Sequence, residues 1–304
     1  MMTLREKYPE LTLGMPSLIE TKSIEECAAL CSALGLQFIE LNLNFPQYQP
    51  QFFQPDRLKR LAAESDLFYT VHFDDNLNIA DFNPYVAEGY RRTVREVIAL
   101  AKVLEIPILN MHLSRGSHYT MPEKKIYFFQ AYRDHYLQRI LEFREECRRE
   151  IGDSGIKICV ENCGGFLDFQ KEAIALLLDS PVFGLTLDVG HNYCAGFTDE
   201  PLILQHAGRL RHMHIHDAKN GKQDHLALGT GELALCRYFE LAEEHNCTVV
   251  LETKTIAGLR QSVAWLKSWK RCFGSADAAL RITASGVCRF DGDADEKDNH
   301  KEAL

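Results

Sequence analysis

Eight short apolar runs alternate with longer segments of helical periodicity along this chain, and this alternation limits the fold more than any other feature of the sequence. The runs are rich in β-branched and aromatic residues and predict strands at residues 11–16, 38–43, 68–73, 107–113, 157–161, 184–189, 211–216 and 248–252. Apolar residues at helical spacing predict helices at residues 24–34, 85–104, 127–150, 172–178, 232–243 and 257–269. Repeated βα units indicate an α/β protein with a parallel sheet, and eight of them favour a closed (β/α)8 TIM barrel over an open doubly wound sheet.

The size of the chain fits one such barrel. Its 304 residues, 46% of them hydrophobic, are enough for one large core and leave little room for a second domain. The alternation stops near residue 274, and the last 14 residues, DGDADEKDNHKEAL, contain six acidic residues and two lysines. We therefore predict a single barrel domain over residues 1–272 and an acidic, poorly ordered tail over residues 273–304.

Charge and composition narrow the possible partners. The chain has 34 Lys and Arg residues against 43 Asp and Glu residues, and its formal net charge of −9 repels phosphate backbones, so nucleic acid is not an expected partner. No run of about 18 apolar residues predicts a membrane span, and the amino-terminal MMTLREKYPELT carries charges where a signal peptide needs apolar residues. We expect a soluble, cytoplasmic protein. No glycine-rich dinucleotide or P-loop fingerprint follows any predicted strand.

Side chains that can bind metal close six consecutive predicted strands. They are His72, His112, Glu161, Asp188 with His191, His214, and Glu252. A barrel of this kind builds its active site at these strand ends, and a polar group kept at a buried end is costly unless it is paired or coordinated. The alternative is that each residue only closes its own strand. Because imidazole and carboxylate ligands without thiolate suit transition metals, we expect one to three divalent ions, with Zn or Mn favoured.

Four motifs give the chain a family resemblance. In sequence order they are VHFDDNLNIA at 71–80, LDVGH at 187–191, HIHDAK at 214–219 followed by DHLALGTGE at 224–232, and LETK at 251–254. Together they resemble the xylose isomerase-like barrel superfamily, which contains endonuclease IV and the sugar (phosphate) isomerases and epimerases. The resemblance covers about residues 11–269 and leaves the tail uncovered.

The resemblance implies three groups of metal ligands. A central quartet would hold one ion, and its members are Glu161, Asp188, His214 and Glu252. His72 and His112 would complete a second site that shares Glu161, and His191 and His225 would belong to a third. Where the endonuclease carries an Asp two residues before the last histidine, this chain has Gln223, and the nearest acid is Asp224.

Two reactions fit these ligands. The first is a metal-dependent isomerase or epimerase acting on a small sugar or sugar phosphate through a metal-stabilised enediolate, with Glu161 and Glu252 moving protons and His191 as a further catalytic candidate. The second is a multi-metal phosphoester hydrolase of endonuclease IV type, with a small phosphodiester favoured over abasic-site DNA as the substrate. A non-catalytic binding module is a third possibility. The sequence favours the isomerase or epimerase.

Five further residues are candidates for contact with the small-molecule substrate. They are Glu40, Arg115, His216, Lys219 and Lys254. Arg115 follows His112 and could meet a phosphate or carboxylate, and the two lysines lie after the seventh and eighth strands, where barrels often bind phosphate. His216 lies on the same side of its strand as His214 because side chains alternate along a strand. A homo-oligomer is compatible with the sequence.

Overall fold

The computed structural model describes residues 3–269 of the chain. The predicted acidic tail, 273–304, and the end of the predicted barrel segment, 270–272, lie outside the described residues. The described part begins at the short helix α1 (Leu4–Lys7) and ends after helix α11 (Ile256–Ser268).

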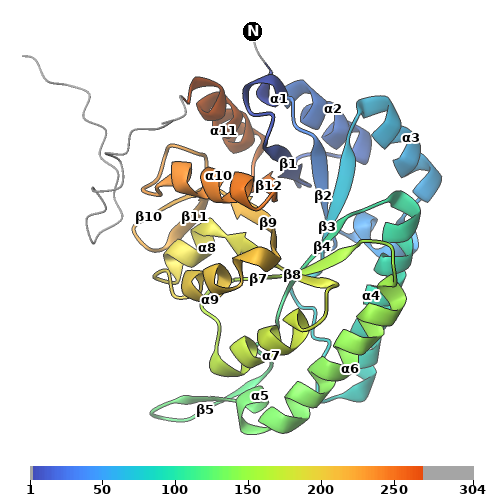
Figure 1. The fold of residues 1–304 in the computed structure, drawn as a ribbon, viewed down its shortest axis with the longest axis vertical. Helices are drawn as coiled ribbons and strands as arrows, with labels where there is room; N and C mark the ends of the chain where they lie inside the picture. Colours follow the sequence, from blue (N-terminus) through green and yellow to red (C-terminus); the bar gives the residue numbers. More distant parts are fainter. Residues whose placement is uncertain (1–2, 270–304) are drawn as a thin grey trace, which may run out of the picture.

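Eight parallel strands close into a barrel, which confirms the predicted fold (Figure 1). Each predicted strand overlaps one of them: β1 (Thr12–Pro16), β2 (Phe38–Asn42), β3 (Phe68–His72), β4 (Ile108–His112), β7 (Lys157–Glu161), β8 (Phe183–Asp188), β9 (Leu210–Ile215) and β12 (Thr248–Leu251). Neighbours in sequence are neighbours in the sheet, and β12 pairs with β1 to close the barrel. The arrangement is a single (β/α)8 TIM barrel.

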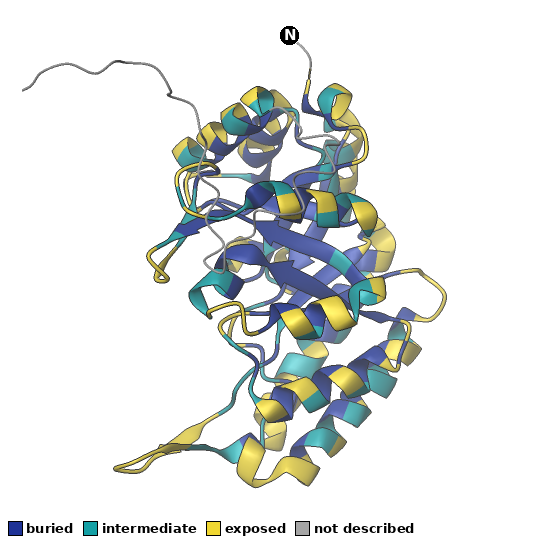
Figure 2. Cartoon of the chain, turned by 60° about the vertical axis from the view of Figure 1, so that its left-hand side comes forward, coloured by how far each residue is buried: buried dark blue, intermediate teal, exposed yellow. Residues whose placement is uncertain are grey.

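Helices surround the barrel and turn their apolar sides inward (Figure 2). After α1 come α2 (Ile24–Leu34), α3 (Pro55–Ser65), α4 (Pro84–Leu104), α5 (Phe128–Ala131), α6 (Arg133–Ile151), α7 (Asp168–Leu178), α8 (Val189–Cys194), α9 (Glu200–Gln205), α10 (Leu235–Glu244) and α11, with short 3-10 turns at Pro46–Tyr48, Pro50–Phe52 and Ala207–Arg209. Strand and helix side chains form one core of buried hydrophobic residues. This closed core holds the strand ends in fixed positions.

Two of the segments that differ from the prediction follow barrel strands. The single helix expected at 127–150 is divided, because Tyr132 between α5 and α6 has non-helical backbone angles of φ −114° and ψ 46°. A hairpin precedes it, formed by β5 (His118–Thr120) and β6 (Lys125–Tyr127). A second hairpin, β10 (Asp217–Lys219) with β11 (Gln223–Leu226), occupies the expected loop after the seventh barrel strand. Both hairpins follow barrel strands and therefore lie at the end where the site is expected.

The register of the barrel strands sets polar side chains in layers. Glu161 of β7 pairs with Thr186 of β8, and Asp188, two residues further along β8, pairs with His214 of β9. Thr186 in turn pairs with His212. Since residues two apart on a strand point to the same side, His212 and His214 both face the interior.

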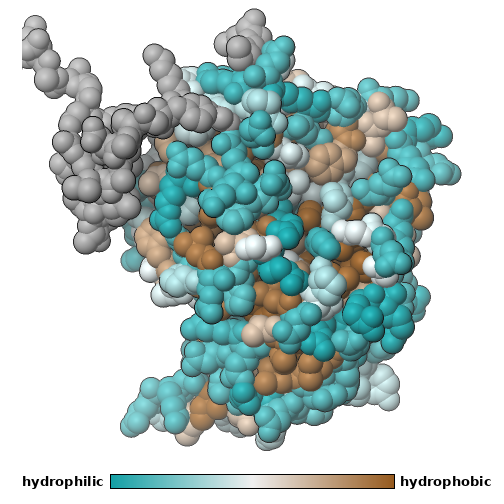
Figure 3. Space-filling view, in the orientation of Figure 1, coloured by the Kyte–Doolittle hydropathy of each residue, from teal (hydrophilic) through white to brown (hydrophobic). Residues whose placement is uncertain are grey.

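The outer surface contrasts with this interior. The face seen in Figure 3 is mostly hydrophilic, with hydrophobic side chains gathered in patches between the elements. No helix within residues 3–269 combines the length and the apolar character needed to cross a membrane.

Candidate metal centre

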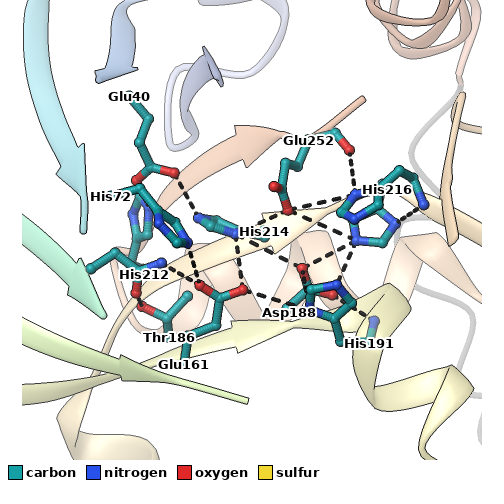
Figure 4. Close-up of polar contacts among 12 residues, drawn as sticks. Glu40, His72, Glu161, Thr186, Asp188, His191, His212, His214, His216 and Glu252 are labelled. Carbon is teal, nitrogen blue, oxygen red and sulfur yellow. Dashed lines mark hydrogen bonds and ion pairs between the residues drawn. The ribbon is translucent and has the colours of Figure 1, made fainter. Parts of the chain in front are cut away.

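The four residues of the predicted quartet meet at the carboxyl ends of the strands (Figure 4). Nδ1 of His214 lies 3.2 Å from Oε1 of Glu161 and 3.1 Å from Oε2 of Glu252. It also lies 3.8 Å from Oδ2 of Asp188. All four side chains are buried. One imidazole nitrogen thus faces three carboxylate oxygens around a common point.

Several buried polar atoms at this point make no hydrogen bond within residues 3–269. Within residues 3–269, Nδ1 of His214 and Oε2 of Glu252 are buried and make no hydrogen bond. Nε2 of His214 also makes none, although it lies 2.9 Å from Oε1 of Glu40; in the neutral ring a proton on Nε2 would face this carboxylate and the lone pair of Nδ1 would face the quartet. Buried polar groups without partners are costly. The donor set therefore fits a divalent cation held by one nitrogen and three oxygens.

The electrostatics of the quartet lead to the same conclusion. Burial by itself raises the pKa of Glu161 and of Glu252, but the positive charge that His214 can carry holds both carboxyl pKa values well below the ordinary value. Burial lowers the pKa of His191, yet the adjacent Asp188 and Glu161 raise it to about 10. These buried carboxylates require positive charge, which protonated histidines or a metal ion can supply.

A second group of buried polar residues contacts the other ring nitrogen of His214 inside the barrel. Nε2 of His212 is hydrogen-bonded to Oε2 of Glu40 at 2.9 Å, and the hydroxyl of Thr70 donates to the same oxygen at 3.1 Å. Nδ1 of His212 contacts Thr248 Oγ1 at 2.5 Å. Glu40 is 2% exposed and both of its oxygens contact other residues of the chain, so its contacts are structural ones and its predicted substrate contact stays a prediction. Glu40 orients the ring of His214, as carboxylates commonly do beneath metal-binding histidines.

The residues of the predicted second metal site, His72, His112 and the shared Glu161, also lie close together. Nε2 of His72 and Nε2 of His112 lie 3.2 Å and 3.3 Å from Oε2 of Glu161. Nδ1 of His72 contacts the Phe73 carbonyl at 2.6 Å, so its proton is directed there and its Nε2 lone pair toward Glu161. Asp75, which the sequence prediction missed, lies 3.8 Å from Nδ1 of His112. The second acid of the VHFDD motif was the available signal for it.

The predicted third group lies beside the quartet. The rings of His191 and His225 have centroids 5.2 Å apart. Asp224 carboxylate oxygens lie 4.0 Å from Nε2 of His191 and 4.0 Å from Nε2 of His225. His225 has a left-handed backbone, φ 52°, so β11 departs from regular strand geometry at this residue. Asp224 thus brings a carboxylate to within 4.0 Å of each of these two histidines.

The remaining predicted contacts have varied surroundings. Nη2 of Arg115 donates to the carbonyls of Gly164 and Gly165, both at 2.6 Å, and so joins the loops after β4 and β7. Lys254 is exposed, and its Nζ lies 2.7 Å from Oε1 of Glu252. Lys219 ends β10 and is half-buried. Arg115 and Lys254 therefore already have strong partners on the chain.

Asp217 explains the LGTGE part of the family motif. Its buried carboxylate accepts hydrogen bonds from the backbone N–H groups of Gly229, Gly231 and Leu233, at 2.8–3.1 Å. A Cβ on Gly231 would lie 2.3 Å from Oδ1 of Asp217, so this position requires glycine. These bonds also explain why α10 begins at Leu235, later than the predicted residue 232. Asp217 has a structural role in holding the loop beside the site.

A cavity of about 610 Å³ lies at the other end of the barrel, near the start of β3 and the end of α4. Arg5, Lys59 and Asp66 are among its charged lining residues. Arg5 already donates to the Asp66 backbone carbonyl at 2.8 Å. Conserved chemistry in this fold occurs at the opposite, carboxyl ends of the strands, and the clustered ligands of this chain lie there.

Sequence comparison places the chain among barrel proteins. A family model described as xylose isomerase-like TIM barrel matches residues 28–269. The chain is similar to the uncharacterized protein MJ1311 of Methanocaldococcus jannaschii, with 27% identity over 233 residues, 72% of this chain and 76% of that protein. It is also similar to the uncharacterized protein MJ1614 of the same organism, with 21% identity over 198 residues, 63% of this chain and 72% of that protein.

Solved structures with the same architecture include two proteins named for epimerase activity. A D-tagatose 3-epimerase-like protein has a TM-score of 0.69 and 24% identity, covering 84% of this chain and 96% of its own. The 3-keto-D-glucoside 4-epimerase YcjR of E. coli has a TM-score of 0.67 and 14% identity, covering 85% and 100%. The IolI protein with a bound zinc atom has a TM-score of 0.64 and 13% identity, covering 84% and 96%. These likenesses show the fold.

Proposed function

Because the chain belongs to the xylose isomerase-like TIM barrel family, we propose that it is a divalent-metal-dependent isomerase or epimerase of a small sugar or sugar phosphate. The observation that carries this proposal is the convergence of Glu161, Asp188, His214 and Glu252 on one point, where two of the described buried polar atoms, Nδ1 of His214 and Oε2 of Glu252, make no hydrogen bond. A D-tagatose 3-epimerase-like protein and a 3-keto-D-glucoside 4-epimerase among the structural neighbours support the substrate class. The neighbour with bound zinc supports a divalent metal.

The quartet would hold the ion through Nδ1 of His214 and one oxygen each of Glu161, Asp188 and Glu252. When bound, a divalent ion polarises a substrate carbonyl and acidifies the neighbouring C–H bond. Lys254 engages Oε1 of Glu252 and leaves Oε2 directed to the centre. His191 is 20% exposed at its side chain and can be reached from the mouth of the barrel.

Two carboxylates, both in contact with Nδ1 of His214, can perform the proton transfers. One, Glu161 or Glu252, removes the proton from the carbon next to the carbonyl and becomes a carboxylic acid. The other takes up a proton from a neighbouring group such as His191, whose pKa is raised to about 10, and returns it to the opposite face, so the stereocentre is inverted and the total number of protons is unchanged. Delivery of the proton to the adjacent carbon gives the isomer instead.

A solvent-exchange experiment tests the proposal. The protein is loaded with Mn²⁺ or Zn²⁺ and incubated in D₂O with a panel of ketoses, aldoses and their phosphates. We expect metal-dependent incorporation of deuterium at the carbon that epimerises, measured by NMR and mass spectrometry. An Asp188→Asn variant is the matched control, since it removes one ligand charge and keeps the side-chain shape. Sugar binding without exchange would instead indicate a binding module.

A phosphoester hydrolase with two or three ions is a second candidate, favoured by one specific observation. Nε2 of His72 and Nε2 of His112 face Oε2 of Glu161, the oxygen turned away from His214, at 3.2 Å and 3.3 Å, and a single-ion epimerase needs neither residue. The cluster of His191, Asp224 and His225 offers further ligands.

Metal counting separates the two candidates. If the protein is a one-ion epimerase, His72→Ala and His112→Ala retain one ion per chain by elemental analysis, and neither variant nor wild type cleaves a chromogenic phosphodiester. If the protein is a hydrolase, wild type holds two or more ions, each variant loses at least one, and metal-dependent phosphodiester cleavage falls with it. His118→Ala, on the exposed strand β5, is the matched control.

A further inference from the structure

His216 is the third inward-facing histidine of the segment HMHIH, and neither proposed reaction uses it. Its ring is fully buried and contacts other residues of the chain, and its predicted substrate contact stays a prediction. Nε2 lies 3.1 Å from both carboxylate oxygens of Asp188. Nδ1 accepts a hydrogen bond from the backbone N–H of His225 at 2.7 Å. The ring therefore lies between a quartet ligand and the hairpin β10–β11.

The backbone contact fixes the proton on His216. A backbone N–H can only donate, so Nδ1 of His216 must present its lone pair to His225. In the neutral ring the proton is then on Nε2, from which it donates to Asp188. Both ring nitrogens are occupied, and neither is available to coordinate an ion. This distinguishes His216 from His191 and His225, with which it forms a potential ligand group.

Packing keeps the ring in this orientation. Its face stacks on His225, with ring centroids 4.2 Å apart and an angle of 28° between the planes. Its edge lies against Gly190 of the LDVGH motif, where a Cβ would be only 1.9 Å from Cε1 of His216. Gly190 therefore provides the space that lets the ring reach Asp188. Asp188 Oδ1 also accepts the His191 backbone N–H at 2.6 Å, so this carboxylate is held from two directions.

We propose that His216 is a positioning residue that orients Asp188 toward the metal ion and couples the hairpin β10–β11 to the ion site. The inference rests on the proposed metal centre and does not depend on which reaction the centre performs. Partners that orient metal ligands in this way typically change metal affinity by about 10- to 100-fold when they are removed.

Two substitutions separate the two hydrogen bonds of His216. In His216→Gln the side-chain amide overlaps the position of Nε2 and can donate to Asp188. In His216→Asn the amide overlaps Nδ1 and can accept from His225, but it does not reach Asp188. His135→Asn, on the exposed face of α6, is the control. Each full-length protein is prepared metal-free, its folding is checked by thermal denaturation, and Co²⁺ is titrated with absorption spectroscopy.

We expect His216→Asn to bind the first Co²⁺ about 10- to 100-fold more weakly, with an altered spectrum, and His216→Gln to stay close to wild type. Equal affinity and spectrum for wild type and His216→Asn would overturn the proposal. So would the loss of one bound ion in both variants with the first site unchanged, because His216 would then be a ligand. Failure of wild type to epimerise sugars counts against the proposed reaction alone, since the Co²⁺ titration decides the role of His216 independently.

Discussion

Glu161→Gln is expected to lower the rate of sugar epimerisation by about a thousandfold or more and to remove most of the bound metal. Glu161 belongs to both the quartet and the predicted second site, because His214 faces its Oε1 while His72 and His112 face its Oε2. The substitution removes the negative charge with almost no change in shape. The barrel should therefore stay folded, while metal binding and catalysis are lost.

The orientation of the side-chain amide in Glu161→Gln explains why metal binding should be lost. The Nδ2 amide of Asn110 donates to Oε2 of Glu161, and Thr186 Oγ1 donates to Oδ1 of Asn110 at 2.7 Å, which fixes the orientation of Asn110. In the glutamine variant the amide oxygen would take the place beside Asn110. The amide NH₂ would then point toward Nδ1 of His214 and toward the position of the ion, where it cannot coordinate.

Steady-state kinetics and elemental analysis check this expectation. Glu244→Gln, at the exposed end of α10, removes the same charge far from the strand ends and should match wild type. A Glu161→Gln variant that keeps its metal and an activity within tenfold of wild type would show that Glu161 is neither a ligand nor an acid–base group. Loss of metal together with full activity would contradict the metal-dependent reaction itself.

Much of the fold and of the quartet could be predicted from the sequence. Strands that are buried on both sides form nearly continuous apolar runs, so an acid or histidine at the end of a run, such as Glu161 or His214, stands out. Parallel strands in a barrel end at one face. Residues at these ends can therefore be grouped into one site from the sequence alone, without the distances between their side chains. Motif order supplied the family, which the matching family model confirms.

Contacts between residues distant in sequence could not be predicted in the same way. His212 lies within a strand, and its role depends on the register that brings it beside Glu40, 172 residues away. Asp224 also required three-dimensional information, because regular strand alternation does not predict the left-handed backbone of His225. The hairpin that carries Asp224 has strands of only three and four residues, which are too short to give a clear periodic pattern in the sequence.

Divalent metal is expected to raise the melting temperature of the metal-free protein by about 10 °C. The quartet places three buried carboxylates around one point, and their mutual repulsion destabilises the folded state unless cations balance it. A ligand that binds only the folded state, present at a thousandfold excess over its Kd, stabilises it by about 4 kcal/mol. For a domain of this size each kcal/mol corresponds to about 2–4 °C.

Differential scanning calorimetry with Zn²⁺, Mn²⁺ and Mg²⁺ checks the size and selectivity of this effect. Mg²⁺ should give the smallest shift, because it prefers a shell of oxygen ligands and the quartet includes the imidazole of His214. Asp188→Asn should reduce the shift to a few degrees and lower the melting temperature of the metal-free protein, since it removes the charged partner of His216 and His191. Chelation should reverse the shift in wild type. If none of the three metals changes the melting temperature of wild type, the quartet is not a metal site. Its buried carboxylates would then have to be balanced by protonated histidines. His191 is one of them, because its pKa of about 10 keeps it charged at neutral pH.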